Sequence, residues 1–321
     1  CLLGADEIYN VAKFQVSGRT SAAPLATTVS ANESLWITPM TKSGNAVKAD
    51  ASIIEKFMDR YNYTILTSAA TDKLNGAPVI NAKGQVIGLF SISGTSQSAT
   101  DANYPKDFVL KGLSQNDASL RQSGLRIGLP HTLEEAVVAL MLSSEKPEIV
   151  HEAVIKDFIE KFPQVNDGYF ALANMQIAKG EISDADKALQ TAIGKAKAKD
   201  EAHYNYARLV YQNVLIPSFE EKVKAVGWSL DKALGEIQQA QSIKQVDAYR
   251  HLQAQIIFAK GDYEKAYTEF EALTRTKFNN PELYLEMAQS RQHLGATDKE
   301  ILDLLNKSIE LCDTPYVSTS A

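Results

Sequence analysis

Cysteine is almost missing from this chain of 321 residues, which contains only Cys1 and Cys312. Two cysteines cannot build a disulfide framework in a protein of this size, and no cysteine–histidine cluster has the spacing of a zinc site. Cys1 at the first position invites the interpretation of a lipid anchor. The residues directly after it lead into strand-like sequence, without a flexible polar tether, so we interpret Cys1 as an ordinary residue.

Long apolar runs and an excess of positive charge are missing as well. No segment approaches the length of a membrane span. Lysine and arginine number 33 against 39 aspartates and glutamates, which gives a net charge of −6. A general nucleic-acid binder needs a basic face, so we expect no nucleic-acid partner and no transmembrane segment. Phosphate-binding loops and dinucleotide fingerprints are absent, and the five histidines share no suggestive spacing, so we expect no cofactor and no metal.

The amino-terminal region, residues 1–95, has the pattern of an all-β domain. Short segments rich in β-branched and aromatic residues are bounded by turn-forming residues. Asn81-Ala82-Lys83-Gly84 has the composition of a tight hairpin turn. We expect a linker over residues 96–131, next to a polar loop at 93–98. The strands are predicted at residues 9–16, 34–38, 61–66 and 85–90.

The carboxy-terminal region repeats a helical pattern every 34 residues. Ala207 follows Ala173 by this interval, and Ala288 follows Ala254 by the same interval. Small residues let two antiparallel helices approach closely, and a glycine after them ends the first helix of each pair. This period and pattern are typical of the tetratricopeptide repeat, a helix–turn–helix unit that stacks into a solenoid.

The solenoid is expected to fill residues 132–321 with about five helix pairs. An insertion of about thirteen residues at 214–227 lengthens the third pair, and the last helix, 299–311, serves as a cap. We place the pairs at residues 132–165, 166–199, 200–246, 247–280 and 281–312.

Stacked repeats create an extended concave face, which the first helix of each pair lines. Such a face suits a protein or peptide ligand. The residues expected to form this contact surface are Phe170, Asn174, Tyr204, Arg208, Tyr211, His251 and Gln255.

The β region resembles trypsin-like serine proteases. Gly76-Ala77-Pro78, followed by Val86-Ile87-Gly88, is similar to their nucleophile loop and the hairpin after it. On this resemblance Asn75 occupies the position of the nucleophilic serine. A second match, collinear with the first, puts Asn10 at the position of the triad aspartate. An amide is no nucleophile, and an asparagine at the orienting position favours the wrong imidazole tautomer. The resemblance therefore implies a catalytically degenerate module, or pseudoprotease.

This resemblance covers about 95 residues and lacks most of a first barrel, and no histidine precedes Asn10. We therefore expect that the complete protein has residues before Cys1. The expected fold is an α+β multidomain one, a partial trypsin-like β-barrel followed by an all-α tetratricopeptide-repeat solenoid. The alternative is a different small β domain. The resemblance also implies a bacterial protein of the cell envelope or periplasm.

The expected function is that of a non-catalytic adaptor, in which the solenoid binds a protein or peptide and the β module is a rigid scaffold. The alternative is a serine endopeptidase that recruits substrate through its repeats, with Ser68, Ser91 or Ser93 as the nucleophile. A third possibility is structural assembly through repeat stacking. The surroundings of Asn75 discriminate between the first two.

Overall fold

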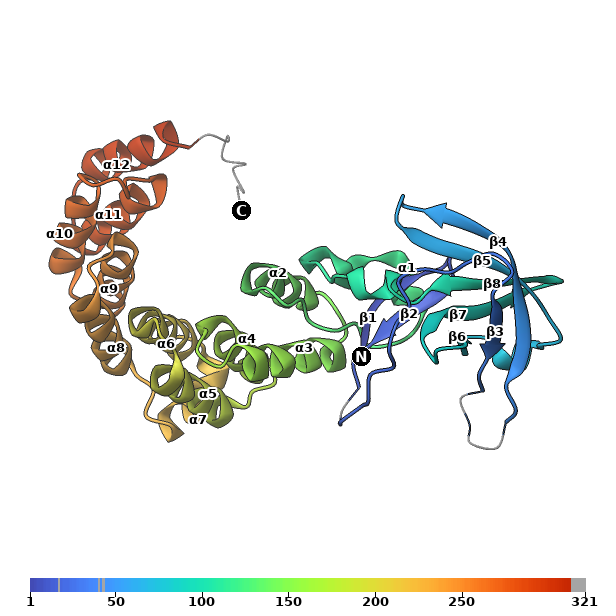
Figure 1. Ribbon diagram of the computed structural model, residues 1–321. Helices are drawn as coiled ribbons and strands as arrows, with labels where there is room; N and C mark the ends of the chain where they lie inside the picture. The colour runs from blue at the N-terminus through green and yellow to red at the C-terminus, as the bar shows by residue number, and fades with distance from the viewer. Residues whose placement is uncertain (17, 40, 42–43, 313–321) are drawn as a thin grey trace. The chain divides into compact units, whose positions relative to one another are not determined.

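The computed structural model describes residues 1–16, 18–39, 41 and 44–312. The chain divides into two compact units, Cys1–Val154 and Ile155–Ala321. Strands dominate the first unit, and the described part of the second unit is helical (Figure 1). Among the helices of the described residues, none is both long and apolar enough to span a membrane.

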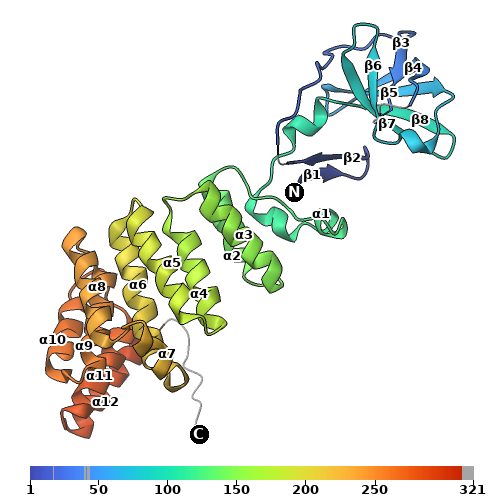
Figure 2. The same ribbon diagram turned by 90° about the horizontal axis from the view of Figure 1, so that it is seen from below.

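The centre of the first unit is a closed antiparallel barrel of six strands (Figure 2). Neighbouring strands follow the order β3-β4-β5-β8-β7-β6, and β3 pairs with β6 to close the barrel. These six strands enclose a hydrophobic core of their own. Their bounds are β3 (Ser34–Ile37), β4 (Val47–Phe57), β5 (Tyr61–Ser68), β6 (Pro78–Asn81), β7 (Val86–Ser93) and β8 (Ser96–Asp101).

A separate two-stranded sheet precedes the barrel, formed by β1 (Leu2–Asp6) and β2 (Val11–Phe14). The predicted strand at 9–16 is shorter than expected, because Tyr9 and Asn10 form the turn between β1 and β2 and Asn10 has a φ of +51°. The ring of Tyr9 stacks on Phe57 with 4.0 Å between centroids. An aromatic cluster thus joins the small sheet to the barrel.

The predicted loop at 93–98 is wrong in its second half. Ser96 begins β8, a strand of the barrel, and pairs with Ser93 across a tight turn. Two of the strand's polar residues, Ser98 and Thr100, are buried, and both hydroxyls have partners. Thr100 Oγ1 donates to the carbonyl of Tyr9 at 2.8 Å, and Tyr63 donates to Ser98 Oγ at 2.9 Å. After β8 the chain continues through η2 (Tyr104–Asp107), η3 (Gly112–Asn116) and α1 (Ala118–Gln122).

The helices of the second unit lie in pairs. In the second unit, the first helix of each pair is packed against the second, and the pairs stack in sequence order (Figures 1 and 2). The packed pairs are α4 (Asn166–Ala178) with α5 (Ile182–Lys195), α6 (Lys199–Val214) with α8 (Leu230–Ile243), α9 (Asp247–Ala259) with α10 (Tyr263–Leu273), and α11 (Pro281–His293) with α12 (Asp298–Glu310). The first expected pair, 132–165, contains α2 (Leu133–Ser143) and α3 (Glu148–Lys161).

The small residues of the repeat have the packing role that the sequence predicts. The four alanines that recur on the first helices, Ala173, Ala207, Ala254 and Ala288, are each at most 1% exposed. Three of the first helices end at a glycine with positive φ, as in Gly261 at +88°, a backbone conformation that other residues adopt only with strain. The described part of the second unit is therefore a stack of repeated helix pairs.

The insertion in the third pair is an ordered element. It contains η4 (Pro217–Phe219) and α7 (Glu220–Ala225), and α7 packs against α5. Trp228, at the end of the insertion, is buried and donates its indole N–H to Asp186 on α5 at 2.7 Å. Lys222 Nζ donates to the carbonyl of Gly180, at the end of α4, at 3.0 Å. These bonds anchor the insertion to the preceding repeat.

Candidate functional site

The strongest candidate site is the surface formed by the first helices of the last four pairs, α4, α6, α9 and α11, which we call the repeat face. On a helix, residues three or four positions apart lie on one side. Tyr204 and Arg208 therefore share a face of α6, as His251 and Gln255 do on α9. The expected contact residues lie in these rows.

Aromatic rings and a guanidinium connect three of these helices. The guanidinium carbon of Arg208 lies 4.5 Å from the ring centroid of Phe170 on α4 and 5.6 Å from that of Tyr204. Tyr204 in turn stacks on Tyr249 of α9, with centroids 4.9 Å apart and planes 26° apart. In the part of the chain that the structure describes, Arg208 forms no ion pair. Its N–H donors are therefore held in place by the rings and remain available to a ligand.

A polar cluster lies between α9 and α11. His251 Nε2 contacts Glu286 Oε2 at 2.6 Å, and Gln255 donates to Glu286 Oε1 at 2.7 Å. Tyr211 of α6 lies near the same carboxylate, and burial together with that negative charge raises the pKa of its phenol. His251 is only 8% exposed, because its ring packs against other side chains. The expectation that His251 projects as a surface contact is therefore corrected.

Among the described contacts, the side chain of Asn174, another expected contact residue, bonds only within its own helix. Its side-chain amide donates to the carbonyl of Phe170, one turn earlier on the same helix, at 2.8 Å, and the residue is exposed. Two further residues, Glu282 and Glu286 on α11, were not predicted from the sequence. Their spacing of four positions puts both carboxylates on one side of α11, and this spacing can be read from the sequence. Their partner His251 lies in the preceding repeat, so the contact itself cannot be read from a local pattern.

Asn10 and Asn75, the two positions singled out by the protease resemblance, both bond to strand β7. Asn10 donates its side-chain amide to Ser91 Oγ at 3.0 Å, and Asn75 Oδ1 accepts the backbone N–H of Ile92 at 2.8 Å. Both asparagines therefore contact adjacent residues of β7. Ser68, another serine considered as a nucleophile, donates to Gln97 Oε1 at 2.6 Å. No histidine precedes His131 in the sequence, so the barrel strands supply no imidazole base.

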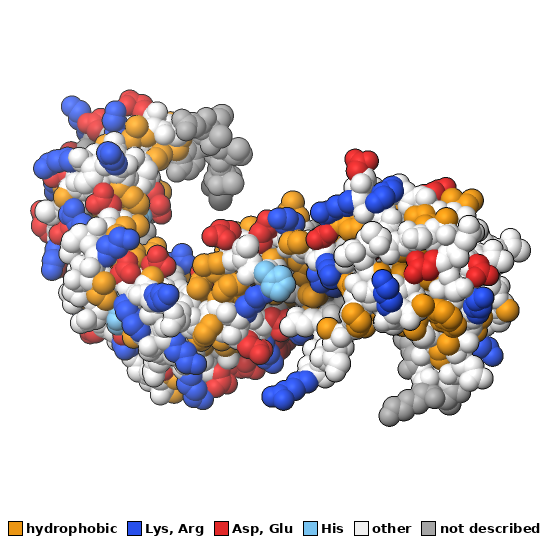
Figure 3. Space-filling view, viewed as in Figure 1, with side chains coloured by type: hydrophobic (Ala, Val, Ile, Leu, Met, Phe, Trp, Pro, Cys, Tyr) orange, Lys and Arg blue, Asp and Glu red, His pale blue; other side chains and the backbone are white. Residues whose placement is uncertain are grey.

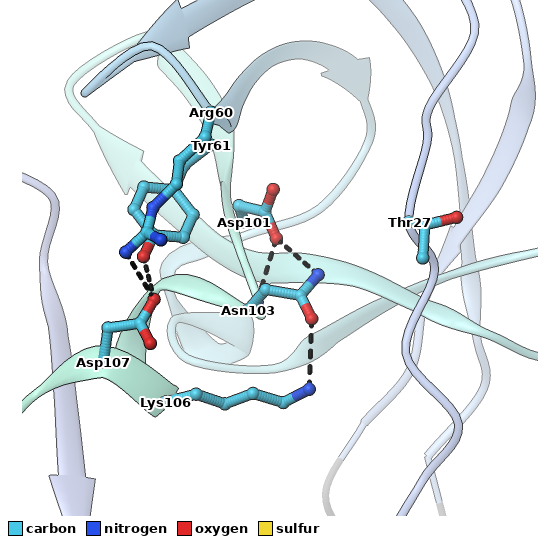
Figure 4. A pocket seen from close by; sticks show the side chains of 7 residues that line it. All are labelled: Thr27, Arg60, Tyr61, Asp101, Asn103, Lys106 and Asp107. Atoms are coloured by element: carbon cyan, nitrogen blue, oxygen red, sulfur yellow. Dashed lines mark hydrogen bonds and ion pairs between the residues drawn. The ribbon is translucent and has the colours of Figure 1, made fainter.

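A polar pocket of about 360 Å³ opens at the other end of β5 and β8 (Figure 4). Arg60 pairs with Asp107 at 2.8 Å, and the hydroxyl of Tyr61 donates to the same carboxylate. Asn103 donates to Asp101 at 3.0 Å and accepts from Lys106 Nζ at 3.2 Å. These side chains satisfy one another, so the pocket offers a ligand few free groups and ranks below the repeat face as a candidate.

Acidic and basic side chains are interspersed on the face of the molecule drawn in Figure 3, and neither sign forms a large continuous area there. This mixture agrees with the small net charge of −6. This face therefore has no large area of one charge sign that would attract an oppositely charged ligand over a long range.

No protein-family model and no curated protein matches the sequence. Among solved structures, the chain is similar to pilF of Pseudomonas aeruginosa, with 17% identity, a TM-score of 0.41, and coverage of 55% of this chain and 75% of that one. It is also similar to a thermophilic TPR protein of Thermus thermophilus, with 15% identity, a TM-score of 0.43, and coverage of 56% and 91%. YrrB, described as a TPR protein with an unusual peptide-binding site, has 14% identity, a TM-score of 0.39, and coverage of 62% and 93%.

Proposed function

We propose that this protein is a non-catalytic adaptor that binds an extended segment of another polypeptide along the repeat face. The observation that carries the proposal is the position of Arg208, which lies over Phe170 and Tyr204 and has no ion-pair partner among the described residues. Arginine and tyrosine are enriched among the residues that dominate binding energy at protein interfaces. Stacked first helices let one extended ligand touch several repeats.

The chemistry of the ligand follows from that of Arg208. A guanidinium donates a fork of parallel hydrogen bonds, which suits a carboxylate best. The side chain is already held by two rings, so less rotamer entropy is lost on binding than for a free arginine. A polypeptide segment with an aspartate, a glutamate or its terminal carboxylate at this point is the expected ligand.

A paired comparison tests this function. Peptides selected from a random library against the immobilised protein would be measured for binding to the wild type and to the Tyr204→Ala, Arg208→Ala double variant. We expect affinity at least tenfold weaker for the double variant, with an unchanged helical circular-dichroism signal. The matched control removes the exposed ion pair Asp184–Lys187 on α5, a second helix, and should bind like the wild type. Equal affinity of the double variant would place the binding site elsewhere.

For the β module, we propose that it is a degenerate trypsin-like barrel that serves as a scaffold. The resemblance assigns Asn10 and Asn75 to one site, and their contacts with Ser91 and Ile92 on β7 support that assignment. Of the serines considered for the endopeptidase alternative, Ser91 lies at this site. Its hydroxyl accepts a bond from an amide, which cannot remove a proton as a general base does. These contacts favour the scaffold over the endopeptidase.

A further inference from the structure

The boundary between the last two repeats brings together one imidazole and two carboxylates from different helices. His251 lies on α9, whereas Glu282 and Glu286 lie one turn apart on α11. One ligand atom from each side chain lies within 4.8 Å of the others. The ring of His251 is fixed by its neighbours, with centroids 5.3 Å from Phe278 and 6.0 Å from Phe270. Its Nε2 faces Glu286 at 2.6 Å.

A second histidine–glutamate pair in the same unit shows what is unusual here. His203 contacts Glu236 at 2.6 Å, and Lys232 pairs with the other oxygen of that carboxylate at 2.8 Å, so a cation balances the negative charge. In the cluster of His251 with Glu286, the third charged group is a second carboxylate, that of Glu282, where the cluster of His203 has Lys232. Within the described residues, no lysine or arginine forms an ion pair with Glu282 or Glu286. The cluster therefore lacks the positive charge that the pair at His203 has.

We propose that His251, Glu282 and Glu286 bind a divalent transition-metal ion of the zinc class. An imidazole nitrogen with carboxylate oxygens is a ligand set that suits zinc, whereas calcium and magnesium take oxygen ligands. Ligand atoms about 2.1 Å from a tetrahedral ion lie roughly 3.4 Å from one another. Small side-chain rotations bring the three ligand atoms to this spacing.

The surroundings of the cluster suit this role. Gln255 donates to the second oxygen of Glu286 at 2.7 Å and so orients the carboxylate, as outer partners of metal ligands commonly do. Three protein ligands leave a fourth position for water or for a group of another molecule. Because the ligands come from two repeats, the bound ion links α9 to α11 and stabilises the stacking of the last pair.

The full chain is first stripped of metal with a chelator and dialysed. Isothermal titration calorimetry of zinc into this protein then tests the proposal. We expect one zinc ion per chain and a thermal unfolding midpoint that rises with zinc concentration, because the ion binds the folded state. Glu282 is exposed, so Glu282→Gln should leave the metal-free midpoint unchanged and weaken zinc binding at least tenfold. His203→Gln, in the charge-balanced pair, should bind zinc like the wild type.

Cobalt(II) identifies the ligands independently of stability. Visible absorption bands typical of tetrahedral cobalt(II) in the wild type, absent from Glu282→Gln, would support the site. An intense sulfur-to-cobalt band would place the metal on a cysteine and overturn the proposal. Zinc affinity equal in Glu282→Gln and wild type, or no saturable binding at all, would overturn it as well, and His251 with Glu286 would then form an ion pair only. None of these outcomes depends on peptide binding.

Discussion

Asn10 donates a side-chain hydrogen bond to Ser91 Oγ over 3.0 Å, although 81 positions separate the two residues. The bond holds the turn between β1 and β2 against β7. Asn75 uses its own side chain in the same way, as an acceptor for the backbone N–H of the next residue, Ile92. These polar side chains therefore hold the β1–β2 turn and the loop that contains Asn75 against β7.

The first prediction concerns reactivity at this site. The wild-type chain should not react with a fluorophosphonate, as followed by the mass of the intact protein. The double variant Asn10→Asp, Asn75→Ser should stay unlabelled too, because it restores two triad positions without the imidazole base that activates the serine. Active trypsin is the positive control. Stoichiometric labelling of the wild type would contradict the scaffold proposal and favour the endopeptidase.

The helical repeats could be predicted from the sequence because their signal is local and periodic. Ala173 and Ala254 recur at intervals that one can count, and both are fully buried. Strand β8 escaped prediction because its polar composition favours a loop, and the partner of Thr100, the carbonyl of Tyr9, lies 91 positions away in the turn between β1 and β2. The contact of His251 with Glu286 is equally nonlocal, since it depends on how adjacent helices are rotated against each other.

The second prediction tests the phase of the repeats at Ala266, a fully buried residue of α10. Ala266→Leu adds three carbon atoms to a packed helix pair and should lower the free energy of unfolding by roughly 1–3 kcal/mol. Lys265→Leu at the adjacent exposed position is the control, and it should change stability by no more than about 0.5 kcal/mol. Both values come from chemical denaturation. An unchanged midpoint for Ala266→Leu would show that the assigned phase is wrong.

The third prediction concerns the buried carboxylate of Asp186, which anchors the insertion. Its oxygens accept from the indole of Trp228 at 2.7 Å, from Gln190 at 2.7 Å and from the hydroxyl of Tyr206. Asp186→Ala leaves these donors without their acceptor, and each unsatisfied buried group costs about 1–3 kcal/mol. The free energy of unfolding should therefore fall by at least about 1–3 kcal/mol, the cost of one unsatisfied group. Unfolding is followed by tryptophan fluorescence and circular dichroism. Asp184→Ala on the exposed side of α5 should have little effect, and a similar small effect of Asp186→Ala would refute the anchoring role.

The last prediction is a pH dependence that arises at His151 on α3. Ser143 Oγ donates its proton to the carbonyl of Leu140 at 2.6 Å, so its contact of 2.7 Å with His151 Nδ1 requires the ring nitrogen to be the donor. The second proton of a charged imidazole must then go to Nε2. Burial disfavours this charged form and lowers the pKa of His151 below its ordinary value of 6.5.

The sign of the effect follows from this lowered pKa. As the pH falls through about 6.5, the unfolded chain takes up a proton at His151 more readily than the folded chain does, so stability decreases until the pH lies below the folded pKa. His151→Gln keeps an amide donor for Ser143 and removes the titrating group. The difference in unfolding free energy between wild type and variant, measured from pH 7.5 to pH 5, should therefore shift against the wild type as the pH falls. Contributions of the other titrating groups are common to both proteins and cancel. A difference that stays constant, or that shifts in favour of the wild type, would contradict a lowered pKa at His151.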